Sequence, residues 1–67
     1  MEFELTEDYI ELNKLLKLVG VVESGGAANT VIIDGEITVN GEQEFRKRRK
    51  LRQGDVVSFH EQKVAIK

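Results

Sequence analysis

The sequence predicts a single α+β domain in which two packed helices precede a small antiparallel sheet. Three observations support this. Apolar residues in the first half of the chain recur at helical spacing, and those in the second half alternate with polar residues, as in half-buried strands. Between the alternating segments lies a short run that holds six of the ten basic residues. A chain of 67 residues has room for one small core, so we expect residues 1–67 to form one domain.

The first predicted helix spans residues 11–19 and follows a short edge strand over residues 2–5 and a polar turn. Its apolar face has the i, i+3, i+4, i+7 spacing and consists of Leu12, Leu15, Leu16 and Val19. Lys14 and Lys17 fall on other faces, where they are free to reach a ligand. Gly20 is expected to end the helix.

The second predicted helix begins after Ser24, which is a favourable N-cap residue. Its buried stripe is Ala28, Val31 and Ile32, and Asp34-Gly35 ends it. Gly25 and Gly26 in the first turn leave the leading backbone N–H groups uncovered, which favours phosphate binding. The equal alternative is that two small residues let this turn pack closely against the first helix.

The second half of the chain predicts about four strands in a meander. Residues 36–39 form the first, and Asn40-Gly41 predicts a two-residue type I′ hairpin turn. The return strand runs from Glu42 toward Phe45 and enters the basic run. Further strands are expected at residues 56–59 and 64–66, joined by a turn at residues 60–63.

The basic segment, Phe45–Arg52, carries six positive charges, whereas the rest of the chain carries four positive and twelve negative ones. The net charge of −2 therefore hides a strongly cationic surface that a polyanion would meet. A solvated surface strand is the plainer interpretation. Because a turn signal and an apolar strand follow the segment, we expect it to lie on the surface of the fold as a binding site. Phe45 and Tyr9 are candidate stacking surfaces for unpaired bases, with core packing as the more frequent role of such residues.

Catalytic chemistry has little support in this sequence. There is no cysteine, the acids lack metal-ligand spacing, and the single histidine, His60, falls in a predicted turn. The glycines Gly25 and Gly26 match neither a P-loop nor a dinucleotide fingerprint. We therefore expect no enzyme, no cofactor, no metal and no small-molecule substrate. No apolar stretch approaches the roughly 20 residues needed to cross a bilayer, and the start of the chain lacks a signal core, so we expect a cytoplasmic protein without membrane contact.

Several of these residues occur together in a known family. The pattern is Leu12-Asn13-x-x-Leu16, Gly20-x-x-x-Ser24, Ala28-x-x-Val31-Ile32-x-x-Gly35-x-Ile37-x-Val39-Asn40-Gly41, then the basic segment and Gly54-Asp55-x-Val57. It resembles the RNA-binding domain first defined in the fourth protein of the small ribosomal subunit. The resemblance covers residues 9–59 and implies two packed helices with a connecting hairpin, the αL motif. The chain is similar to a subgroup of stand-alone bacterial proteins that carry Ser-Gly-Gly after the linker.

The resemblance implies a non-catalytic protein that contacts structured RNA of the ribosomal or transfer RNA class, with the ribosome or another ribonucleoprotein as an expected setting. Many family members carry RNA-binding arginines where this chain has Glu11 and Gly25, which shifts the expected contacts to other residues. The expected RNA-binding residues are Lys14, Lys17, Ser24, Gly25, Gly26, Arg46, Lys47, Arg48, Arg49, Lys50 and Arg52. The alternatives are a protein-interaction module that docks an acidic partner and a single-stranded DNA binder in replication or repair.

Overall fold

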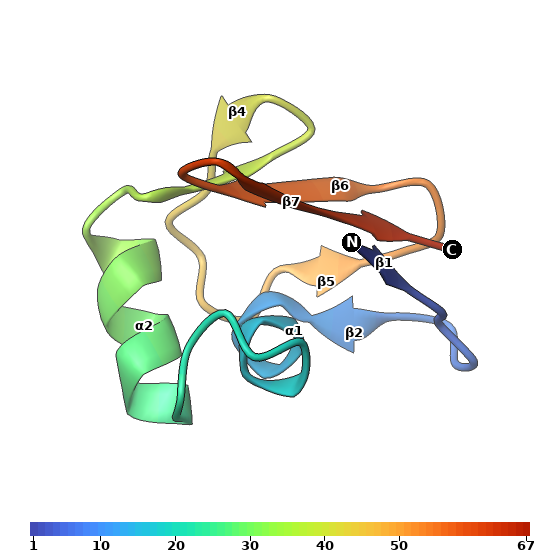
Figure 1. Ribbon diagram of the computed structural model, residues 1–67, viewed down its shortest axis with the longest axis horizontal. Helices are drawn as coiled ribbons and strands as arrows, with labels where there is room; N and C mark the ends of the chain where they lie inside the picture. The colour runs from blue at the N-terminus through green and yellow to red at the C-terminus, as the bar shows by residue number, and fades with distance from the viewer.

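The computed structural model describes all 67 residues and confirms the α+β class. A five-stranded sheet lies above a lower layer that contains helix α1 and a two-stranded ribbon, and helix α2 stands at one end (Figure 1). The elements are β1 (Glu2–Phe3), β2 (Ile10–Glu11), α1 (Leu12–Leu18), α2 (Gly25–Ile33), β3 (Ile37–Val39), β4 (Glu42–Gln43), β5 (Lys50–Leu51), β6 (Val56–Phe59) and β7 (Gln62–Ile66). Neither helix has the length and apolar character needed to cross a bilayer.

The two helices form where the apolar spacing predicts them. Leu12, Leu15 and Leu16 of α1 are fully buried, as are Ala28 and Ile32 of α2. The helices pack against each other and are joined by a hydrogen bond in which Asn13 Nδ2 donates to Asn29 Oδ1 at 3.2 Å. The chain leaves α1 through Gly20, whose φ of +79° is a conformation that glycine adopts without strain. This end of α1 turns the chain back so that α2 can pack beside it.

The sheet confirms the predicted hairpin. Asn40 and Gly41 both have positive φ, 54° and 87°, as a type I′ turn requires. β1 is an edge strand, as expected, but it is shorter than predicted and pairs in parallel with β7. A second tight turn follows β6, where His60 has a φ of +54° and β7 already begins at Gln62.

The predicted meander is wrong. The strand order is β1-β7-β6-β3-β4, and β5 leaves this sheet to pair with β2 in a separate ribbon. The reason lies in the basic segment: five consecutive cations cannot present an apolar face to the core, so the chain leaves the sheet after Gln43. It returns to the core at Leu51, the one aliphatic side chain in the segment, which is fully buried. The segment thereby descends from the sheet to the layer of the helices (Figure 1).

The hydrophobic core lies between these layers. Residues of the sheet, such as Ile37 and Val57, contribute to it together with Leu16 and Ile32 of the helices. Only one charged residue, Glu44, is buried with it. Glu44 lies directly before the basic segment, where the chain leaves the sheet.

Candidate nucleic-acid interface

The buried carboxylate of Glu44 organises the start of the basic segment. Its Oε2 accepts hydrogen bonds from the Arg46 backbone N–H at 3.0 Å and from Arg46 Nε at 2.9 Å. Its Oε1 accepts from Arg46 Nη2 at 3.1 Å and from Arg49 Nη1 at 2.7 Å. The Arg46 guanidinium, assisted by Arg49, outweighs the effect of burial and lowers the pKa of Glu44 to about 2. Both arginines are therefore held in place by a charged anchor.

The backbone of the same segment fixes it against α1. The carbonyl of Arg49 accepts the N–H of Leu12 at 2.9 Å, and the carbonyl of Lys47 accepts the N–H of Asn13 at 3.0 Å. These are leading N–H groups of α1, which have no partner within the helix. The β2–β5 ribbon, in which Glu11 lies opposite Lys50, also attaches the segment to the strand directly before α1. The backbone of the basic segment is therefore attached to α1 and β2.

Four cationic side chains share one concavity on this surface. Its volume is about 440 Å³, and it is lined by Arg46, Arg48, Arg49 and Lys50 without any hydrophobic residue. Glu44 raises the pKa of Arg46, so this guanidinium stays charged. Because arginine N–H groups match the oxygens of a phosphate, such a concavity is suited to a phosphodiester.

The Tyr9 ring lies beside Lys50 and one further cation of the segment, Arg52. Lys50 Nζ lies 4.9 Å and Arg52 Cζ 5.7 Å from the centre of the Tyr9 ring, within range of cation–π attraction. Arg52 is also attached through its backbone N–H, which donates to Asp55 Oδ2 at 2.8 Å. Burial opposes ionisation of Asp55, but this bond and one from the Asn40 amide outweigh it and lower its pKa. In this structure the Tyr9 ring is a support for cations, whereas Phe45, with 56% of its surface exposed, is the more open aromatic surface.

The first turn of α2 is uncovered, which is what the phosphate-binding interpretation of Gly25 and Gly26 requires. Ser24 Oγ accepts the N–H of Ala27 at 3.1 Å, which confirms the predicted cap. The N–H groups of Gly25 and Gly26 donate to no group of the protein. A Cβ at Gly25 would meet no atom within 4 Å, and one at Gly26 would meet only Ser24 Oγ at 3.9 Å. The alternative, that these glycines are needed for close packing, is therefore wrong.

The predicted site residues do not all lie together. Four side chains of the basic segment line one concavity, and Lys14, Lys17 and the start of α2 are not part of its lining. Both lysines are exposed on α1. Lys14 lines a different groove, beside Glu7 and Glu11. The role of each of these residues in RNA binding stays a prediction.

Sequence reasoning missed Glu44. Its signal was present, because an acid immediately before a cationic run can pair with it, but spacing alone does not show that this carboxylate is buried. The contacts around Tyr9 were missed for a similar reason, because the β2–β5 ribbon that brings Lys50 and Arg52 to it joins segments about 40 residues apart.

The sequence and fold of this chain are similar to those of known proteins. Residues 3–67 match the family described as the S4 domain. The chain is 43% identical over 58 residues to YbcJ of Escherichia coli (strain K12), covering 87% of this chain and 83% of YbcJ. It is 44% identical over 52 residues to RlbA of Bacillus subtilis (strain 168), named "probable ribosome maturation protein", covering 78% of this chain and 73% of RlbA.

The solution structure of E. coli YbcJ has the same fold. It superposes with a TM-score of 0.75 at 41% identity, covering 97% of this chain and 84% of YbcJ. That structure is described as revealing an αL motif involved in RNA binding. The two helices and the mainly antiparallel sheet of the present chain match the fold that carries this motif. The chain belongs to the S4 domain family.

Proposed function

We propose that this chain is a non-catalytic cytoplasmic protein that binds structured RNA of the ribosomal or transfer RNA class. The observation that carries the proposal is the cationic concavity of Arg46, Arg48, Arg49 and Lys50 beside the buried carboxylate of Glu44. The αL motif of YbcJ and the name of RlbA support RNA as the ligand and a ribonucleoprotein as the setting.

The anchored arginines favour binding through their preorganisation. Glu44 holds Arg46 and Arg49 before any ligand arrives, so less side-chain entropy is lost when a phosphate binds. Each guanidinium has five N–H donors, and Glu44 engages only some of them. Arg48 and Lys47 are exposed, make no ion pair, and add positive charge around the paired arginines. This combination suits the irregular backbone of folded RNA better than a single groove of a regular duplex.

The open start of α2 adds a second contact to the proposal. The free N–H groups of Gly25 and Gly26 point along the positive end of a nine-residue helix, where a phosphate is favoured. Lys14 and Lys17 on α1 add positive charge outside the basic segment. A folded RNA that presents several phosphates on one face can use separate contacts of this kind, whereas a single extended strand meets the basic segment alone.

The experiment compares two charge-matched variants by their salt dependence. Lys47→Gln/Arg48→Gln removes two cations that have no partner in the protein. Lys63→Gln/Lys67→Gln removes two from the region of β7, one of which, Lys67, pairs with the exposed Glu2. With a transcribed RNA hairpin as probe, we expect the first variant to bind more weakly and to flatten the slope of log K against log[salt] by about 1.5. The second variant should keep the wild-type slope.

Equal slopes in all three proteins would contradict the proposal, because the basic segment would then be a solvated surface. Competition by single-stranded DNA as strong as that by the RNA would favour the DNA-binding alternative. An acidic peptide that displaces the RNA at equal charge concentration would favour the protein-interaction alternative. Crosslinking the protein in cells and sequencing the attached RNA identifies the ligand.

A further inference from the structure

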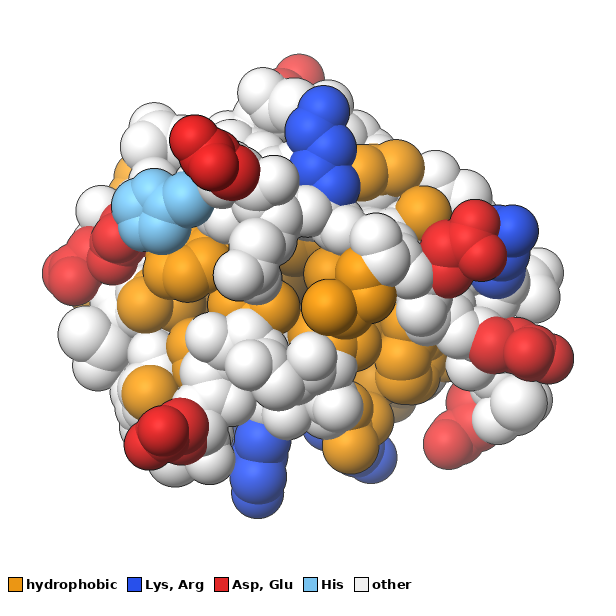
Figure 2. Space-filling model, in the orientation of Figure 1, with side chains coloured by type: hydrophobic (Ala, Val, Ile, Leu, Met, Phe, Trp, Pro, Cys, Tyr) orange, Lys and Arg blue, Asp and Glu red, His pale blue; other side chains and the backbone are white.

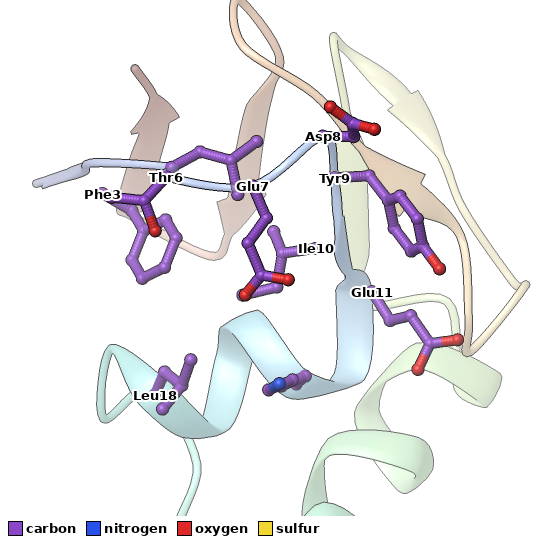
Figure 3. Close-up of a pocket in the computed structure, with 10 residues that line it drawn as sticks. Phe3, Thr6, Glu7, Asp8, Tyr9, Ile10, Glu11 and Leu18 are labelled. Atoms are coloured by element: carbon purple, nitrogen blue, oxygen red, sulfur yellow. The ribbon is translucent and has the colours of Figure 1, made fainter.

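A groove separate from the cationic concavity lies between the N-terminal segment and α1. Its volume is about 560 Å³, which is within the range of binding pockets for small ligands or a few peptide side chains. In Figure 3, Phe3 comes from one wall and Leu18 from the other, and Ile10 lies between them. Glu7 extends from the N-terminal segment toward the helix.

The groove leaves apolar surface uncovered. Leu18, at the end of α1, is 57% exposed, and Phe3 is only partly buried against the core. Figure 2 shows hydrophobic side chains exposed in the hollow across the middle of the face in view. Leu5 and Ile10 in the same lining are buried in the core, so the exposed apolar surface comes from Leu18, Tyr9 and part of Phe3, and such surface beside polar side chains is typical of a binding site.

The rim of the groove is acidic. Glu7, Asp8 and Glu11 line it against a single cation, Lys14, and none of the three acids takes part in an ion pair. The first eleven residues contain five acids and no basic side chain. Carboxylates repel phosphate, so the part of the groove near Glu7 and Asp8 is not suited to RNA, whereas the predicted RNA contacts Lys14, Lys50 and Arg52 lie at its edge.

We propose that the groove docks a basic peptide segment of another protein, in which leucine or phenylalanine side chains alternate with lysine or arginine. The apolar side chains would cover Phe3 and Leu18, and the cations would lie beside Glu7 and Asp8. This occupant follows from charge complementarity, because an acidic or purely apolar segment would leave the carboxylates unpaired. The proposal does not depend on RNA binding. If both hold, the protein joins an RNA to a protein through two surfaces of opposite charge.

The test uses a labelled synthetic peptide of alternating lysine and leucine, and a control peptide with serine in place of leucine. NMR of the ¹⁵N-labelled protein should show shifts confined to residues 3–18 with the leucine peptide and none with the serine peptide. Leu18→Ser should weaken peptide binding about tenfold, the size expected when a half-exposed leucine no longer becomes buried. Ile33→Ser is the matched control, because Ile33 is 56% exposed but lies on α2.

Charge is tested separately from apolar contact. Glu7→Gln/Asp8→Asn should weaken binding of the leucine peptide, whereas Glu23→Gln/Glu61→Gln, which neutralises two exposed acids elsewhere, should not. RNA affinity should be the same in wild type and Leu18→Ser. Four results would overturn the proposal: equal binding of the serine peptide, shifts outside the groove, loss of RNA affinity in Leu18→Ser, or sedimentation showing a dimer that Leu18→Ser abolishes. The last would identify a second copy of this chain as the occupant.

Discussion

The carboxylate of Glu44 lies 2.7 Å from the guanidinium of Arg49, and this ion pair links the stability of the fold to the arrangement of its surface charge. Replacing Glu44 by glutamine keeps the shape of the side chain but removes the negative charge. We expect Glu44→Gln to destabilise the protein by about 1–3 kcal/mol, because hydrogen bonds to a charged acceptor are weakened. Urea unfolding measures this change.

The same variant separates positioning from net charge. Removing an acid makes the protein less negative, which by itself favours RNA binding. If Glu44 positions Arg46 and Arg49, RNA affinity falls instead. Glu42→Gln is the matched control, because Glu42 is exposed, has no side-chain partner and changes the net charge equally. Stronger RNA binding in both variants would show that Glu44 acts only through its charge.

The pKa of Glu44 predicts an acid-sensitive fold. Because its folded-state pKa is about 2, below its ordinary value of 4.5, the stabilisation is fully present above about pH 5 and is lost as the pH falls toward 2. We expect a loss on the order of 2 kcal/mol, less than the full shift implies, because solvent screens the exposed Arg46 side chain. Urea midpoints from pH 6 to 2.5 measure it. Asp55 contributes in the same direction, so the Glu44→Gln variant should retain a smaller pH dependence, and one as steep as the wild type would exclude Glu44 as the source.

Two leucines of α1 test the packing of the core. Leu16 is fully buried, so Leu16→Ala should cost about 2–5 kcal/mol, which is a large fraction of the stability of so small a domain. Leu18 lies two residues away on the same helix but is 57% exposed. Leu18→Ala should therefore change the free energy of unfolding by less than about 1 kcal/mol. Thermal melts of the two variants that coincide would mean that the buried face of α1 is misassigned.

The sequence predicts features that depend on neighbouring residues better than features that depend on residues far apart in the chain. The helical spacing of Leu12, Leu15 and Leu16, the cap at Ser24 and the turn at Asn40-Gly41 are local signals, and each is confirmed. The pairing of β5 with β2 is not local, and it was missed because two residues on each strand carry too little pattern to specify a partner.

The candidate site shows the same division. That the cationic run lies on the surface was predictable from its composition. The pairing of Arg46 and Arg49 with Glu44 could not be predicted from composition, because Glu44 becomes buried only where the chain leaves the sheet. Arg46 and Arg49 are paired with Glu44, so removing both would leave a buried carboxylate without its partners.

The start of α2 offers a test in which stability and RNA affinity change in opposite directions. Gly26→Asp places a carboxylate in the first turn, where the helix dipole favours it, and replaces a glycine that lowers helix propensity. There is room for the side chain, since a Cβ at this position meets only Ser24 Oγ at 3.9 Å. We expect a gain of about 0.5–1 kcal/mol in stability. RNA binding should weaken, because the new carboxylate repels a phosphate that would approach the free N–H groups.

The isosteric variant Gly26→Asn serves as the control, since asparagine has the same size without the charge. If the N–H groups of Gly25 and Gly26 hold a phosphate, Gly26→Asn binds RNA more tightly than Gly26→Asp, and the difference shrinks as salt screens the repulsion. If both variants bind RNA as tightly as the wild type, α2 takes no part in RNA binding, and the basic segment alone carries the affinity. Equal weakening by both would instead indicate that any side chain at this position blocks the approach of RNA, so that shape at the start of α2, and not its positive potential, determines the contact.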